Sequence, residues 1–541
     1  MATQWQTFPI EFKGGLISNQ SPLQQGINAI GSATVLQNME PDRQGGYTKI
    51  KGYDKFASAE VPGEGKMLAV KAVNSTLAVA ARKVDADAIT DVSGLSSGDS
   101  GKTAYYTGTS AGWTFRAVSA NTNGGKVYHA TYNFDGDTKT VFVDGTNYPG
   151  IYNSNGNGMT FLTSSSANIN TDVEGAELVS IFKSAAFYSK GATVYFTAPF
   201  TVDNFSAANG AGTINVGNDV TGMVVFREQL IIFTTDSIKR LTGNTSADFQ
   251  LSPITDKIGC VSADTIQEFG GDIIYLAPDG IRLLSATDRI GDFGLDVASD
   301  KIFKDSDTFI SSTSSYASCI LREKGQYRIF AYIDGQDRAI AQGLVATKFI
   351  SQGAGGVNWS TTRGIKVYNA DSIYDGNKEV IFFAEKDGYL YEMEKGNSFG
   401  DDTETNKIEA IYESPYMPIT DPQVRKTAYK LTLFTDPTGT LDLSFRLLFD
   451  FDSGGDTRVV QPLPISIGAS AAGAGAAAVF LFGAPNAVFG TAKFGGKLKK
   501  VYNENLIGSF HTVAMRIVDD SINPAFTLDT AILEYRQNDR Q

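Results

Sequence analysis

Short runs of apolar or alternating residues recur along the chain from about residue 65 to residue 400. Each run is rich in Val, Ile, Tyr and Phe and is bounded by Gly, Asp or Asn, a pattern typical of β-strands joined by tight turns. Examples are MLAVKAV (67–73), WTFRAV (113–118), TKTVFVDG (138–145), GMVVFREQLIIFTT (222–235) and EVIFFAEKDGYLYEM (379–393). Stretches with the charged faces of long surface helices are scarce. The pattern therefore predicts an all-β protein.

Asp-Gly pairs at 144–145, 279–280 and 387–388 each lie between two such runs, which is a strong hairpin signal. The same order of strand, Asp-Gly turn and strand recurs over hundreds of residues, and such recurrence is typical of β-propeller blades. The alternative is a set of ordinary hairpins in two stacked sandwiches. No strict repeat period is visible, so the number of blades stays open.

The character of the sequence changes twice, which divides the chain into three parts. Residues 1–60 are rich in turn formers, among them Pro41-Asp42 and Gly45-Gly46, and predict an extended N-terminal arm with one hairpin. Residues 61–400 form the central domain, predicted to be irregular and β-propeller-like. Residues 401–541 contain five alternating runs, which predict a C-terminal antiparallel β-sandwich.

A charge-free loop interrupts the C-terminal part at residues 459–492, and its centre reads GASAAGAGAAAVFLFGAP. The apolar part is long enough to span a bilayer. It is dominated by Ala and Gly, however, contains Pro485, and is strongly apolar only at VFLF. The favoured interpretation is a loop that is flexible or packed on neighbouring copies. A further hypothesis places this loop at a distal tip that touches a cell envelope.

Charge and composition narrow the classes of function. Charged residues make up 19% of the 541 residues and the net charge is −13, whereas proteins that grip nucleic acid usually present a basic surface. An acidic wall repels phosphate, so a channel along which DNA slides is compatible with this charge, as is a simple role in solubility. Cys260 and Cys319 are too few for a disulfide framework or a zinc site, and we expect free, buried thiols. The opening MATQWQTFPIEFKGG does not read as a signal peptide.

Motifs of catalysis are incomplete. GTSAG (108–112) has the spacing of a serine-hydrolase elbow, but the following WTFRAV reads as a strand, so we expect a hairpin tip. The chain has two histidines, His129 and His511, which cannot supply a His-rich metal site. No catalytic residue, metal site or cofactor is therefore predicted. Carboxylate pairs such as Asp519-Asp520 leave a carbohydrate-active propeller enzyme as an alternative, because glycosidases use two carboxylates.

Two stretches carry a family resemblance. The opening LQNMEPDRQGGYTKIKGY, with Asn38, Gly45-Gly46 and Gly52-Tyr53, resembles the N-terminal signature of tail hub or nozzle proteins of short-tailed bacteriophages. These are also called head-to-tail stabilisation or tail tubular B-type proteins. The stronger match lies within residues 236–285, where the family pattern is filled by Ile258-Gly259-Cys260, Thr265-Ile266, Tyr275-Leu276 and Asp279-Gly280-Ile281. The C-terminal strands are also similar to the closing sandwich of that family, whereas we find no counterpart for the charge-free loop.

The resemblance implies a non-enzymatic structural protein of the virion tail, made in the cytoplasm of the bacterial host. Six copies would form a ring below the adaptor (connector) ring, extend the DNA ejection channel and seal it until infection. The expected partners are copies of itself, the adaptor ring, tail fibre or tip proteins, double-stranded DNA in passage and the host cell envelope. The expected assembly or tip contacts are Asn38, Tyr47, Tyr53, Phe480, Phe482, Phe489 and Phe494. A receptor-binding or fibre-anchoring virion protein is the main alternative.

Overall fold

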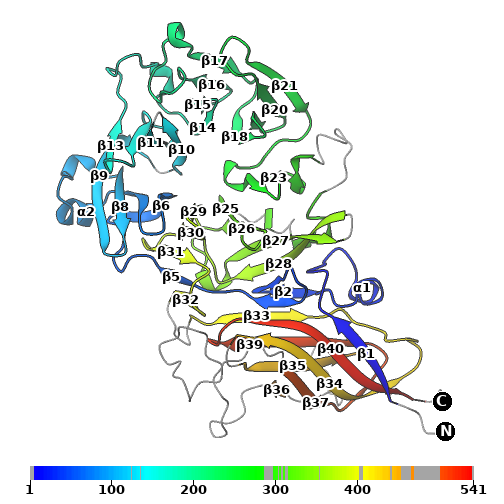
Figure 1. The fold of residues 1–541 in the computed structure, drawn as a ribbon. Helices are drawn as coiled ribbons and strands as arrows, with labels where there is room; N and C mark the ends of the chain where they lie inside the picture. Colours follow the sequence, from blue (N-terminus) through cyan, green and yellow to red (C-terminus); the bar gives the residue numbers. More distant parts are fainter. Residues whose placement is uncertain are drawn as a thin grey trace.

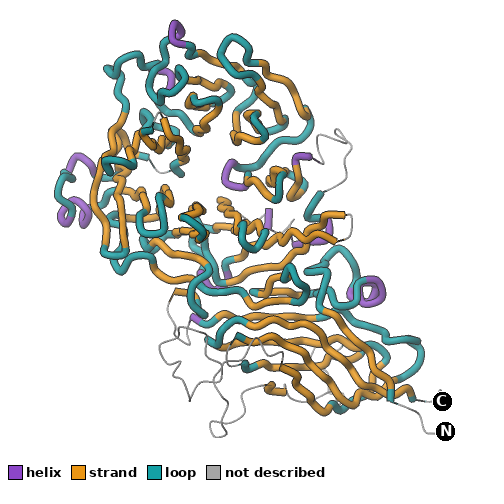
Figure 2. The backbone as a smooth tube through the Cα atoms, in the orientation of Figure 1, coloured by secondary structure: helices purple, strands orange, loops and turns teal. Residues whose placement is uncertain are grey.

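The computed structural model confirms the all-β prediction. It describes residues 5–123, 125–134, 136–285, 297–302, 304–305, 309–310, 315–351, 354–400, 406–438, 441–451, 465–467 and 500–538. Strands dominate the described chain, and its helices are few and short (Figure 2). No helix in these ranges combines the length and the apolar character that crossing a membrane requires.

Six sheets of three to five strands are arranged as the blades of a β-propeller (Figure 1). Neighbouring strands within a blade are mostly antiparallel and consecutive in the sequence, because short turns join them. The first two blades contain β6 (Glu64–Ala72), β7 (Ala78–Lys83), β8 (Lys102–Thr109) and β9 (Gly112–Thr122), then β10 (Tyr128–Phe134), β11 (Asp137–Val143), β12 (Gly150–Asn153) and β13 (Gly158–Phe161).

The remaining four blades follow the same plan. The third and fourth contain β14 (Leu178–Phe182), β15 (Ala185–Lys190), β16 (Thr193–Phe196) and β17 (Gly212–Asn215), then β18 (Val220–Phe226), β19 (Gln229–Thr234), β20 (Ile238–Thr242) and β21 (Gln250–Thr255). The fifth has three strands, β22 (Gln267–Phe269), β23 (Asp272–Ala277) and β24 (Gly280–Leu283). The sixth contains β29 (Asn369–Asp375), β30 (Lys378–Ala384), β31 (Leu390–Met393), β5 (Tyr53–Lys55) and β32 (Phe399–Gly400).

The three Asp-Gly pairs lie between paired strands, as predicted. They connect β11 to β12, β23 to β24 and β30 to β31. Gly145, Gly280 and Gly388 have φ angles of +73°, +139° and +83°, a range that glycine adopts without the steric cost of a Cβ atom. The repeated hairpin that predicted propeller blades is therefore a real repeat of the fold.

Apolar clusters hold neighbouring blades together. Phe187 of the third blade and Ile232 of the fourth belong to one such cluster of buried side chains. The ring closes where the first blade packs on the sixth, and there Tyr106 shares a cluster with Phe382. Because burial of apolar surface stabilises by about 25 cal/mol per Å², each of these interfaces contributes to the closure of the ring.

Part of a larger sheet completes the ring between the fifth and sixth blades. A nine-stranded sheet begins with β25 (Ser315–Leu321), β26 (Gln326–Tyr332), β27 (Gln342–Ser351) and β28 (Ala354–Arg363). It continues through β2 (Val35–Gln37), β33 (Ile408–Glu413), β39 (Val513–Ser521), β35 (Leu443–Phe449) and β36 (Ile465–Ile467). β25 contacts β22 of the fifth blade and β29 of the sixth. The propeller and the C-terminal sandwich therefore share one sheet.

A seven-stranded sheet completes the predicted sandwich. It contains β1 (Gln6–Glu11), β3 (Met39–Pro41), β4 (Tyr47–Lys49), β34 (Lys426–Pro437), β37 (Lys500–Asn505), β38 (Ser509–Phe510) and β40 (Phe526–Gln537). Leu431 and Leu533 from this sheet share one buried core with Phe445 and Ile517 from the nine-stranded sheet. The five alternating runs of the C-terminal part supply β33, β34, β35, β39 and β40, as predicted.

The N-terminal residues are extended, as predicted, but the described part does not project from the molecule. β1, β3 and β4 belong to the seven-stranded sheet, β2 belongs to the nine-stranded sheet and β5 completes the sixth blade. The short helix α1 (Pro22–Asn28) lies between β1 and β2 along the chain, and the Ser21 side chain caps it by accepting a hydrogen bond from the Gln24 N–H. The N-terminal segment thus ties the sandwich to the propeller.

Buried charges fix this segment in place. The Lys49 Nζ lies 3.1 Å from Asp519 Oδ2, and both side chains are almost fully buried. Burial lowers the pKa of Lys49 and raises the pKa of Asp519, in each case against the attraction of the partner. Arg328 of β26 contacts Glu40 of β3 at 2.9 Å and Glu394 at 2.7 Å. Because an unpaired buried ion is costly, these contacts hold the segment to both parts of the molecule.

Candidate functional site

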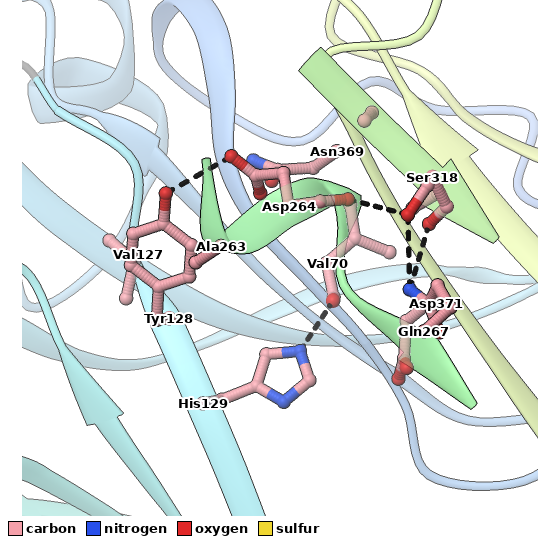
Figure 3. Close-up of a pocket in the computed structure, with 12 residues that line it drawn as sticks. Val70, Val127, Tyr128, His129, Ala263, Asp264, Gln267, Ser318, Asn369 and Asp371 are labelled. Carbon is pink, nitrogen blue, oxygen red and sulfur yellow. Dashed lines mark hydrogen bonds between the residues drawn. The ribbon is translucent and has the colours of Figure 1, made fainter. Parts of the chain in front are cut away.

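A polar cavity of about 190 Å³ lies where the first strands of several blades meet (Figure 3). Its lining comes from β6, β10, β22, β25 and β29, and from the short 3-10 turn of residues 263–265 that precedes β22. The polar lining residues are Tyr128, His129, Asp264, Gln267, Ser318, Asn369 and Asp371. Ligand sites are usually concave and carry a few convergent polar groups, so this cavity is a candidate site.

One side of the cavity is built around Asp264. The Tyr128 hydroxyl donates to Asp264 Oδ2 at 3.0 Å (Figure 3), and the Lys126 Nζ lies 3.1 Å from the same oxygen. Burial lowers the pKa of Lys126, while Asp264 opposes that shift. Burial and the neighbouring carboxylate both raise the pKa of Tyr128 well above its ordinary value, so this hydroxyl stays protonated and acts as a donor.

The other side is built around Asp371. Its carboxylate lies 2.8 Å from the Lys71 Nζ and accepts a hydrogen bond of 2.8 Å from the Ala72 N–H. Burial opposes ionisation of Asp371, but the charges of Lys71 and His129 and these hydrogen bonds together lower its pKa. Burial lowers the pKa of His129, and its Nε2 lies 3.0 Å from the Val70 carbonyl oxygen. Because a carbonyl only accepts, His129 carries its proton on Nε2 and donates.

Hydrogen bonds also join the blades across the cavity. The Ser318 hydroxyl of β25 donates to the Asp264 carbonyl, and Gln267 of β22 donates to the Ser318 carbonyl and hydroxyl. The Asn369 side chain of β29 donates to the Met67 carbonyl of β6 at 2.6 Å. A polar network in which each member has a partner rigidifies its surroundings, and this one connects blades that are distant in the sequence.

The chemistry of the cavity follows from these pairs. Asp264 and Asp371 are its two carboxylates, and each is held by a lysine. A glycosidase needs two carboxylates that face the bond to be cleaved, whereas these two already serve as acceptors within the protein. Within the described ranges, no group of three or more His, Cys, Asp or Glu side chains is placed to hold a metal ion. We call this arrangement, built around Asp264 and Asp371 with their lysine partners, the polar hub.

We predict that Lys71→Met lowers the free energy of unfolding by about 2 kcal/mol, because the hydrogen-bonded charge pair with Asp371 is lost from a site with little access to water. The matched control is Lys83→Met, which removes a pair with Glu64 at 3.1 Å in which both side chains are about half exposed. Such an exposed pair contributes about 1 kcal/mol or less. Urea titrations followed by tryptophan fluorescence compare the two variants, and equal losses would contradict a stabilising role for the hub.

The structure places the predicted contact residues as follows. Asn38, Tyr47 and Tyr53 are buried inside the chain. Asn38 donates to the Glu409 carbonyl and accepts from the Arg363 N–H, and the Tyr47 hydroxyl donates to the Gly31 carbonyl. Their described contacts thus lie within the chain, and their role in assembly stays a prediction. The four phenylalanines of the predicted tip, Phe480, Phe482, Phe489 and Phe494, lie outside the described residues.

Two further predictions are confirmed. Ser110 of the GTSAG motif lies at the tip of the hairpin between β8 and β9, not at the start of a helix. Cys260 and Cys319 are free and buried, and burial raises their pKa values to about 11 and about 12. The hub itself was not predicted, because its residues come from parts of the chain separated by up to 302 positions. The single local signal is that it contains one of the two histidines.

No protein-family model matches the sequence, and no curated protein matches it. Among solved structures, the chain resembles the extracellular domain of the hybrid two component system BT3049 from B. thetaiotaomicron, with 8% identity and a TM-score of 0.37 over 61% of this chain. The chain spans 40% of the length of that protein. It also resembles an exo-beta-1,3-galactanase from Phanerochaete chrysosporium, with 9% identity and a TM-score of 0.24, over 90% of this chain and 100% of the other. At these values neither similarity bears on function.

Proposed function

We propose that this protein is the subunit of a tail nozzle or hub of a short-tailed bacteriophage, and that six copies form a ring below the adaptor ring. The observation that carries the proposal is the resemblance of residues 236–285, which span the junction of the fourth and fifth blades. Cys260, Tyr275 and Ile281 from the matched positions are all buried. Cys260 and Tyr275 lie in the apolar cluster between the fourth and fifth blades, and Ile281 lies in the large core shared with the sandwich. The matched positions therefore include residues that pack in the core.

The architecture suits the rigid wall of a conduit. Blades arranged in a ring leave few free strand edges, and a sheet shared with the sandwich limits movement between the two parts. The polar hub adds hydrogen bonds across the ring. A subunit built in this way can keep its shape when DNA under pressure moves past it.

The hub also constrains where DNA could pass. The cavity among the first strands of the blades has a volume of about 190 Å³, which leaves no room for a duplex, and its lining includes two carboxylates that are each paired with a lysine. A DNA channel would therefore lie between copies of the protein and not along the propeller axis of any one copy. With a net charge of −13 per chain, a ring of such subunits would repel phosphate and let DNA slide.

The proposal predicts sixfold rings. Native mass spectrometry and negative-stain imaging of the purified protein, alone and with its adaptor ring, should show hexamers. Quantitative mass spectrometry of the virion should count six copies. Trimers of the purified protein, both alone and with the adaptor ring, would instead favour a receptor-binding or fibre-anchoring protein. A virion that does not contain the protein would contradict the proposal.

A further inference from the structure

Helix α1 and the turn that follows it expose three large apolar side chains to solvent. Leu23, Ile27 and Ile30 follow one another at spacings of four and three residues, and 36%, 58% and 37% of their surfaces are exposed. The buried face carries Gln25, which donates to the Ser32 hydroxyl and the Ala33 carbonyl, both at 2.9 Å. A surface helix normally buries its large apolar side chains, so the outward stripe is suited to contact with another segment.

The helix cannot turn this stripe inward, because its buried face is tightly packed. A Cβ atom on Gly26 would lie 2.0 Å from the Tyr416 carbonyl oxygen. The glycine therefore allows α1 to sit directly on the chain that follows β33. The apolar stripe is a fixed surface of the molecule.

A cavity of about 650 Å³ continues the stripe. Ile27 and Ile30 line one wall, Phe12 and the turn between β3 and β4 line the rest, and Asn358 contributes a polar group. Asn358 is 93% buried (7% exposed), and its side-chain oxygen has no hydrogen-bond partner among the described residues. Rotation of the amide exchanges its oxygen and nitrogen, so Asn358 can bind either a donor or an acceptor. We call the stripe and this cavity the α1 groove.

The charged groups at the rim of the α1 groove are already engaged. Lys13 lies 2.8 Å from Glu11, Asp42 accepts from the Gln44 N–H at 2.7 Å, and Arg43 donates to the Glu323 carbonyl at 3.4 Å. Helix α1 itself contains no charged residue. The groove is therefore complementary to an uncharged apolar segment whose backbone or side-chain amide can bind Asn358.

We propose that the α1 groove binds the Val479–Phe482 stretch of the charge-free loop from a second copy of this chain. Residues 459–492 contain no charged residue, and VFLF is the most apolar part of this stretch. Exposed apolar side chains such as those of the α1 stripe mark an interaction site. The proposal rests on the ring of copies proposed above, because that ring supplies the second copy at a fixed distance.

The loop is long enough for this contact. Residues 468–499 connect β36 to β37, and both strands are the last in the order of their sheets. The twelve residues from Ile467 to Val479 span up to about 40 Å when extended, at about 3.3 Å per residue. A segment of that reach can leave its own sandwich and arrive at the flank of a neighbour. In a closed ring, one such contact per copy joins every subunit to the next.

Cysteine cross-linking of the full-length protein tests the proposal. Ile27→Cys and Leu481→Cys are made separately, and the two single variants are mixed, assembled and treated with a short bis-maleimide. The native cysteines are both 2% exposed and should not react. The expected product is a covalent dimer in the mixture, and a ladder up to the ring size in the double variant. Ile340→Cys is the matched control, since Ile340 is 44% exposed but lies outside the α1 groove.

The outcomes separate this inference from the proposed ring. Two results would overturn the docking proposal but not the ring proposal. In the first, rings form but the mixture of Ile27→Cys and Leu481→Cys gives no covalent dimer. In the second, the mixture of Ile340→Cys and Leu481→Cys gives as much dimer. Cross-links only within single chains of the double variant would also overturn it. Protein that forms no rings at all would end both proposals. A second variant, Ile27→Asp, should fold normally and weaken assembly at least tenfold, and unchanged assembly would count against the groove.

Discussion

Replacing Arg328 with Met should lower the free energy of unfolding by about 3–5 kcal/mol, because it leaves buried carboxylates without their central cation. Arg328 is 1% exposed and lies between Glu40 and Glu394, whose contacts come from the N-terminal segment and the sixth blade. Lys324 remains beside both carboxylates, but a single ammonium cannot balance two negative charges at this depth. Thermal unfolding followed by tryptophan fluorescence gives the difference. The exposed Arg425, changed to Met in the same way, is the matched control and should melt like the unchanged protein.

The pH dependence gives this prediction a second readout. Burial opposes ionisation of Glu394, but Arg328 and Lys324 outweigh it and lower the pKa of Glu394 from 4.5 to about 2. A carboxyl with a depressed pKa stabilises the folded state above pH 4.5, and this contribution is lost as the pH falls toward 2. The difference in the free energy of unfolding between the unchanged protein and Arg328→Met should therefore be largest near neutral pH and decrease as the pH falls from 4.5 toward 2. A difference independent of pH would mean that Arg328 acts by packing alone.

Gly52→Ala should be about as damaging, at about 3 kcal/mol or more, because the added methyl group has nowhere to go. A Cβ atom on Gly52 would lie 1.8 Å from the Ser398 carbonyl oxygen. Backbone hydrogen bonds hold the two segments at this distance, from Gly52 N–H to the Gly396 carbonyl and from Tyr53 N–H to the Ser398 carbonyl. The substitution must push β5 away from β32, and β5 is the strand that completes the sixth blade.

The matched control for this change is Gly156→Ala. Gly156 lies in the turn between β12 and β13, and a Cβ atom there would meet no other atom within 4 Å. Hydrogen exchange provides a local readout, because opening of the sixth blade should expose amides of β31 and β5 while those of the third blade stay protected. If Gly52→Ala and Gly156→Ala unfold at similar temperatures and the amides of β31 stay protected from exchange, β5 can shift without opening the propeller.

The sequence predicts what depends on neighbouring residues. Asp279-Gly280 predicts the β23–β24 hairpin because a tight turn needs a residue with positive φ, and the alternation in 526–537 predicts β40 because one face of a half-buried strand is apolar. β2, β3, β4 and β5 have three residues each, too few for any period to be visible. The sequence could therefore not predict that the N-terminal segment contributes strands to three sheets.

The hub could not be predicted for a different reason. His129 lies beside Asp371 and donates to Val70, but these residues are separated by 242 and 59 positions along the chain. Their types, one histidine, one aspartate and one valine carbonyl, form no local motif. The one catalytic spacing in the sequence, GTSAG, lies elsewhere, on the hairpin between β8 and β9. The closure of a ring brings together residues that only the complete fold makes neighbours.

The pairing of β1 with β40 has a consequence for how the chain is made. Gln6 lies opposite Tyr535 and Glu11 opposite Thr530, so β1 finds its partner only after β40 has left the ribosome. Contacts with such long sequence separation slow folding, because the chain must close a loop of several hundred residues before β1 and β40 can pair. A chain whose translation stops before β40 has a β1 without its partner strand. Formation of the seven-stranded sheet thus distinguishes chains that include β40 from shorter ones before assembly.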